Sequence, residues 1–137
     1  AMILVGRSSD RMNERRFHVA GCLIVSAIGL VCSVYFAKSD ITLGLIFYTV
    51  SLAGAYGAYS PFWSIPPAYL SGTAAAAGIA LINSVGNLGG FFGPYVMGYV
   101  SQFTGSYDYG VLFLAACMVL SALNITVFVH QTGKSVG

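Results

Sequence analysis

The stretch Val19–Ala37, VAGCLIVSAIGLVCSVYFA, decides the fold class of this chain. It holds no charged side chain, and a helix of this length, rising about 1.5 Å per residue, roughly matches the ~30 Å hydrocarbon core of a bilayer. The stretch lacks the alternation of apolar and polar residues that is typical of barrel strands. Because lipid cannot pair backbone N–H and C=O groups, we predict a membrane-spanning helix.

Similar apolar runs lie on its C-terminal side and predict three more spans, at about 42–64, 73–100 and 109–130. Residues 1–5 are too short to cross a bilayer, so they are interpreted as the end of a truncated span. Prolines lack a backbone donor and clash with the preceding helical turn. The second span is therefore expected to kink or end over residues 60–67, which contain Pro61, Pro66 and Pro67. The predicted fold class is an all-α membrane protein with four transmembrane helices.

Composition supports the same class. The chain is 57% hydrophobic and 7% charged, whereas about a quarter of the residues in a soluble domain are charged. Between Asp40 and Asp108 no side chain is formally charged. The odd number of cysteines gives no disulfide framework, and no metal-ligand spacing, phosphate-binding loop or catalytic set is present. The sequence therefore predicts neither an enzyme nor a cofactor or metal site.

The basic residues predict the orientation. With four crossings, loop 6–18, the region around residues 70–77 and tail 131–137 lie on one side of the membrane. That side carries five of the six basic residues, namely Arg7, Arg11, Arg15, Arg16 and Lys134. The other side carries Lys38 alone. Because basic loops stay inside, loop 6–18 and the tail are expected in the cytoplasm.

Loop 6–18, GRSSDRMNERRFH, is a tight basic connection between antiparallel helices. Asp10 can end a helix and pair with Arg11 or with an arginine of a neighbouring helix. Such pairs could form in one conformation of the protein and break in another. The alternative is a plain cytoplasmic anchor without a conformational role.

Two carboxamides lie on the third span in helical register with small residues and a proline. Steps of three and four residues place Asn83, Gly86, Asn87, Gly90 and Pro94 on one stripe. Carboxamides are costly against lipid, so the stripe should face protein or a wet cavity. Asn83 and Asn87 could line a substrate cavity, or they could only bond a neighbouring helix.

The glycines of the same span form two small-xxx-small pairs. Gly86 pairs with Gly90, and Gly89 pairs with Gly93. Such pairs allow the backbone of another helix to approach closely, so these glycines and Pro94 are predicted to mark a helix-packing face.

Aromatic and hydroxyl side chains recur near the end of the second span, at Tyr56, Tyr59, Ser60 and Trp63. Rings with a polar tip suit the wall of a cavity that binds a small polar ligand. The alternative is an aromatic belt at the membrane interface, since Trp63 lies near the end of the span.

Loop 6–18 resembles the cytoplasmic loop G-x-x-x-D-R-x-G-R-R of the major facilitator superfamily. Gly6, Asp10, Arg11 and Arg15 match this motif, while Asn13 and Glu14 depart from it. The form SDRMNERRFH is similar to the repeat of this loop in the anion:cation symporter family.

The blocks 62–78 and 82–94 resemble the tenth and eleventh helices of bacterial members of that family, especially tartrate- and nicotinate-type transporters. The resemblance covers the chain from the end of an eighth helix to the tail. It implies that Trp63, Asn83 and Ser60 help to line the substrate site, and Asn87 and Tyr59 are added from their helical register.

The resemblance implies the C-terminal part of a transporter that carries a small organic anion with a cation, often a proton, across a bacterial inner membrane. No ionisable group lies in the core of the spans, so anion pairing and proton coupling must come from a missing N-terminal half. The chain alone is expected to transport nothing. The alternative is a self-contained four-helix membrane protein, either a dimeric efflux carrier or a scaffold.

Overall fold

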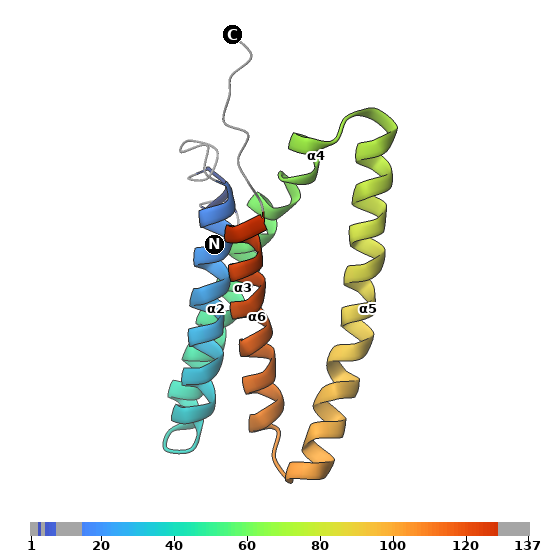
Figure 1. Ribbon diagram of the computed structural model, residues 1–137. Helices are drawn as coiled ribbons and strands as arrows, with labels where there is room; N and C mark the ends of the chain where they lie inside the picture. The colour runs from blue at the N-terminus through green and yellow to red at the C-terminus, as the bar shows by residue number, and fades with distance from the viewer. Residues whose placement is uncertain (1–2, 4, 8–14, 129–137) are drawn as a thin grey trace.

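The computed structural model describes residues 3, 5–7 and 15–128, and these residues form helices joined by short turns (Figure 1). The helices are α2 (Arg15–Ala37), α3 (Ile41–Trp63), the short α4 (Pro66–Tyr69), α5 (Gly72–Thr104) and α6 (Asp108–Phe128). Four of them, α2, α3, α5 and α6, are long and apolar enough to cross a membrane. The prediction of an all-α chain with four spans is confirmed.

The long helices run alternately in opposite directions (Figure 1). The start of α2, the region of α4 and the last turn of α6 lie at one end of the molecule, and the turns after α2 and α5 lie at the other. This pairing of ends is the one that four crossings require. Helix α2 begins at Arg15 rather than near Val19, because long basic side chains can reach the interface while their backbone stays helical.

Helices α2 and α3 pack with their backbones very close together. A Cβ atom added to Gly54 would lie 2.8 Å from the carbonyl oxygen of Cys22, and one added to Gly29 would lie 2.8 Å from the amide nitrogen of Ser51. Between these glycines the buried Ser26 hydroxyl donates a hydrogen bond to the Ser51 carbonyl oxygen at 2.8 Å. Small residues and an interhelical hydrogen bond therefore hold this pair together, as is common within membranes.

The other face of α2 packs against α6. Ala27 and Leu30 of α2 are buried with Ala115 of α6, and partly buried side chains of α6 surround them. Of the described helices, α5 contacts only α6 and α4. Met97 of α5 touches Gly110 of α6 near the shared turn, while the middle of α5 stands apart (Figure 1).

The proline segment ends α3 and starts a separate short helix. Helix α3 continues through the buried Pro61 to Trp63, and its C-cap is Ser64. Pro66 and Pro67 then occupy the first positions of α4, where a missing N–H costs no helical hydrogen bond. The end of α3 at Trp63 therefore falls within the expected range of residues 60–67, and Pro61 lies inside the helix.

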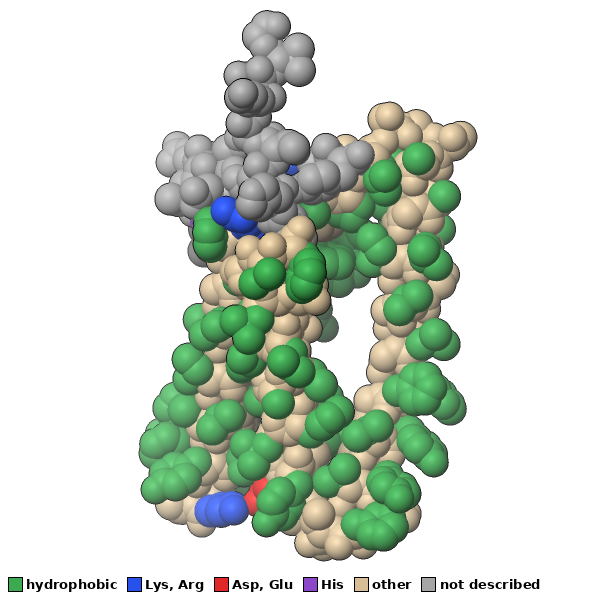
Figure 2. Space-filling view, viewed as in Figure 1, with side chains coloured by type: hydrophobic (Ala, Val, Ile, Leu, Met, Phe, Trp, Pro, Cys, Tyr) green, Lys and Arg blue, Asp and Glu red, His purple; other side chains and the backbone are tan. Residues whose placement is uncertain are grey.

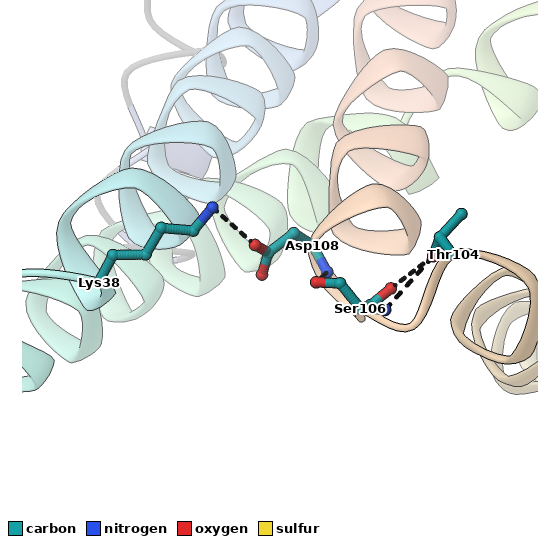
Figure 3. A network of polar contacts seen from close by, with 4 residues as sticks. All are labelled: Lys38, Thr104, Ser106 and Asp108. Atoms are coloured by element: carbon teal, nitrogen blue, oxygen red, sulfur yellow. Dashed lines mark hydrogen bonds and ion pairs between the residues drawn. The ribbon is translucent and has the colours of Figure 1, made fainter.

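An ion pair joins the turn after α2 to the start of α6. Lys38 Nζ lies 2.9 Å from Asp108 Oδ2. The Ser106 hydroxyl accepts a hydrogen bond from the Asp108 amide, and the Thr104 hydroxyl donates to the Ser106 carbonyl (Figure 3). The hydrogen bond to Asp108 raises the pKa of Lys38 above its ordinary value of 10.5. The same hydrogen bond lowers the pKa of Asp108 below its ordinary value of 3.8. The contact therefore contributes fully between pH 3.8 and pH 10.5. It is lost as the pH rises through the raised pKa of Lys38 and as the pH falls through the lowered pKa of Asp108.

We expect Lys38→Met to lower the thermal unfolding temperature only slightly at neutral pH, because both side chains are accessible to solvent. The difference from the wild type should shrink in high salt, which screens exposed charges. Unfolding followed by circular dichroism in micelles at low and high salt measures this. A loss that stays the same at high salt would show that Lys38 acts through packing and not through its charge.

Candidate functional site

A cavity of about 460 Å³ lies between α5 and the layer formed by α2, α3 and α6. The space-filling view shows the molecule hollowed between α5 and the other helices (Figure 2). The walls are mostly apolar and carry a few polar groups, which is the usual composition of a small-molecule site. Among the described residues that line it none is charged.

The end of α3 supplies the aromatic wall of this cavity. Tyr59 and Trp63 are one helical turn apart, and their rings meet edge to face with centroids 6.0 Å apart. Phe62 packs on Trp63 in a similar way at 5.5 Å, and it lines the cavity too. These contacts restrict the rings, so the phenol and indole N–H groups can be presented to a ligand in a defined place.

Helix α5 supplies the carboxamides of the opposite wall. Asn83 and Asn87 both line the cavity, together with their neighbours Ile82 and Gly86. Each carboxamide can donate two hydrogen bonds and accept two. The structure therefore brings together four of the five residues predicted to bind substrate, namely Tyr59, Trp63, Asn83 and Asn87.

Ser60, the fifth, lies elsewhere. It neighbours Gly6, and a Cβ atom on Gly6 would lie 2.7 Å from its hydroxyl oxygen. Tyr56 of the same predicted stripe is also outside the cavity lining, with 63% of its surface exposed. Residue 60 follows Tyr59 by about 100° around the helix, which is enough to turn it toward a different neighbour.

The glycines predicted to pack have no neighbour among the described residues. A Cβ atom on Gly86, Gly89, Gly90 or Gly93 would meet nothing within 4 Å, and Pro94 is exposed. Close helix packing instead uses glycines of α2 and α3 that the sequence reasoning did not single out. The sequence did contain a pattern that indicates this face of α3. The small residues Gly44, Ser51, Gly54 and Ala58 follow one another at intervals of seven, three and four positions, which places them on one side of a helix.

Ser121 of α6 lines the cavity and was not predicted. Its hydroxyl donates to the Cys117 carbonyl at 2.8 Å, which leaves the hydroxyl oxygen able to accept a hydrogen bond from a ligand. Ile125, one turn later, lines the same wall. The spacing of these two residues was visible in the sequence, but nothing distinguished Ser121 from other serines within spans.

Part of the basic loop motif is described. Arg15 Nη1 donates a hydrogen bond to the Ser64 carbonyl oxygen at 3.0 Å, and the guanidinium of Arg16 lies 4.6 Å from the centroid of the Phe17 ring. Asp10 and Arg11 lie outside the described residues, so their predicted pairing stays a prediction. Within the described part of the chain no group of His, Cys, Asp and Glu is placed to hold a metal ion.

Known transporters match this chain along almost its whole length. Two putative tartrate transporters of Agrobacterium vitis are 40% and 41% identical to it, over 99% and 100% of the chain. The putative metabolite transport protein NicT of Pseudomonas putida is 36% identical over 88% of the chain. The chain is homologous to the C-terminal part of these transporters, which are of the major facilitator type.

This homology confirms the resemblance to major facilitator transporters that was seen in the loop and in the two helix blocks. The relatives are named as transporters, so the prediction that the chain is not an enzyme is also confirmed. With its four apolar helices and its transporter relatives, the chain is an integral membrane protein. The chain spans about 30% of the length of the tartrate transporters that it matches. No family model and no solved structure matches it.

Proposed function

We propose that this chain forms one wall of the substrate site in a secondary transporter for a small organic anion, a carboxylate of the tartrate kind. The cavity between α5 and the α2–α3–α6 layer carries the proposal. It sets two carboxamides of α5 opposite the Tyr59 and Trp63 rings of α3, in a volume that suits a small molecule. The similarity to putative tartrate transporters supports the substrate class.

The chemistry of the lining supports a division of roles. Carboxamides, a phenol, an indole N–H and the Ser121 hydroxyl can bond the hydroxyl and carbonyl oxygens of a hydroxy acid. None of the described lining residues can neutralise a carboxylate. A buried anion needs a positive partner, and a coupled proton needs a titratable group. We assign both to the remaining part of the transporter, beyond this chain.

The transport cycle follows from that arrangement. Secondary transporters bind substrate near the midplane between two halves, which rock about the site and open it to each side in turn. In our proposal this chain moves as part of one half, with loop 6–18 and the C-terminal tail in the cytoplasm. An inner-membrane transporter of this kind would use a cation, most simply a proton, to drive uptake.

We expect labelled tartrate to enter proteoliposomes that hold the complete transporter in which this chain occurs. An inward proton gradient should stimulate uptake and a protonophore should abolish the stimulation, because the proton is the proposed partner. Liposomes that hold only the 137-residue chain should show no uptake. Uptake that does not depend on the proton gradient would contradict proton symport. If no small carboxylate enters the proteoliposomes, the proposed substrate class is wrong.

A further inference from the structure

Two residues of the basic loop motif contact the end of α3 that lines the cavity. Arg15 binds the carbonyl oxygen of Ser64, which directly follows Trp63. Gly6 lies against Ser60, which directly follows Tyr59. Each contact therefore falls on the immediate chain neighbour of a cavity ring, and both come from the loop side of the molecule.

Few backbone N–H groups follow the end of α3 that could donate hydrogen bonds to its last carbonyl oxygens. The carbonyl oxygens of Pro61 and Phe62 accept hydrogen bonds from the amides of Ser64 and Ile65. The next two residues, Pro66 and Pro67, carry no N–H. The Arg15 guanidinium supplies a donor for the Ser64 carbonyl, and a positive charge at the C-terminal end of a helix is electrostatically favourable.

We propose that Arg15 and Gly6 are positioning residues that hold the last turn of α3 so that Trp63 and Tyr59 face the cavity. The loop motif then sets how well the cavity binds its ligand, in addition to keeping this end of the protein in the cytoplasm. The part that concerns the ligand rests on the proposed function. The part that concerns the position of Trp63 stands on the two contacts alone.

Trp63 is the only tryptophan of the chain, so its fluorescence reports its surroundings directly. In micelles that hold the full 137-residue chain, Arg15→Gln should shift the emission to the red and increase quenching by acrylamide, with unchanged helix content. The matched control is Arg7→Gln, which removes the same charge from an exposed site on the same side. Equal emission from both variants and the wild type would overturn the role of Arg15.

A double substitution tests the second contact. A Cβ atom on Gly6 would lie 2.7 Å from the Ser60 hydroxyl oxygen but 3.5 Å from the Ser60 Cβ, an ordinary contact distance. Gly6→Ala alone should therefore disturb the emission of Trp63, and adding Ser60→Ala should restore it. If Gly6→Ala changes nothing, or if the double variant stays as disturbed as the single one, Gly6 does not position α3.

Tartrate uptake, compared with the emission of Trp63, distinguishes a failure of the positioning role from a failure of the proposed function. In the complete transporter, Arg15→Gln should raise the KM for tartrate about tenfold, the size of one hydrogen bond to a charged group, and leave the maximal rate unchanged. Arg7→Gln should change neither. A changed emission with an unchanged KM would keep the positioning role and contradict the cavity as the substrate site. A raised KM with unchanged emission would overturn the positioning role.

Discussion

Alanine in place of Trp63 is expected to lower the uptake efficiency of the transporter about thirtyfold while the protein stays folded. The indole forms part of the cavity wall and is held there by Tyr59 and Phe62. Truncating a tryptophan at the centre of a binding site costs about 2 kcal/mol of binding free energy, and ~1.4 kcal/mol corresponds to tenfold. Asn83→Ala should cost about tenfold, since it removes one or two hydrogen bonds.

The measurement is the ratio of maximal rate to KM for labelled tartrate, normalised to the amount of folded transporter in the membrane. Tyr56→Ala is the matched aromatic control because Tyr56 lies on the same helix, outside the cavity lining. Ser84→Ala is the control for Asn83, since it is an exposed polar neighbour that does not line the cavity. If all four variants lose uptake to the same extent, the cavity between α3 and α5 is not the substrate site.

Leucine in place of Gly54 is expected to destabilise the folded chain by about 3 kcal/mol, at the upper end of the cost of overpacking a core. The added side chain would enter a contact in which even a Cβ atom lies 2.8 Å from the Cys22 carbonyl oxygen and 2.9 Å from the Ser26 amide nitrogen. Both are backbone atoms of α2 and cannot rotate away. The two helices must separate, which also breaks the bond from Ser26 to Ser51.

Denaturant unfolding in micelles, followed by circular dichroism, measures this loss. Gly21→Leu is the control because Gly21 lies on α2 and a Cβ atom there meets nothing within 4 Å. The two variants introduce the same side chain, so they differ only in the contact. A similar loss for Gly54→Leu and Gly21→Leu would show that glycine-mediated packing of α2 on α3 does not stabilise the fold.

The helices could be predicted closely because their cause is local. The run 19–37 is apolar throughout, and an apolar run of that length in lipid must satisfy its own backbone groups. The ends were less well predicted. Helix α2 extends back to Arg15, and α5 extends to Thr104, where Gly105 adopts a left-handed conformation and ends the helix. Hydropathy does not report these features, because they depend on capping and on side-chain reach.

The candidate site could be predicted in part. Asn83 and Asn87 were found because helical spacing places them on one stripe and because carboxamides avoid lipid. Ser60 was included with Tyr59 and Trp63, yet it faces Gly6. Ser121 was missed although it lines the same cavity. Spacing along one helix does not say which neighbour each face meets, and that choice separates these residues.

The sequence by itself determined that this chain is a set of four membrane helices, that five of its six basic residues fall in segments 6–18 and 131–137, and that Asn83 and Asn87 share a stripe. These properties depend on composition and helical period, which are local. Only the tertiary structure decided that α3 and α5 face each other across a cavity, that Gly54 and Gly29 form the tight contact, and that Arg15 meets the end of α3. These results depend on how whole helices are placed, which packing between residues far apart in the chain decides.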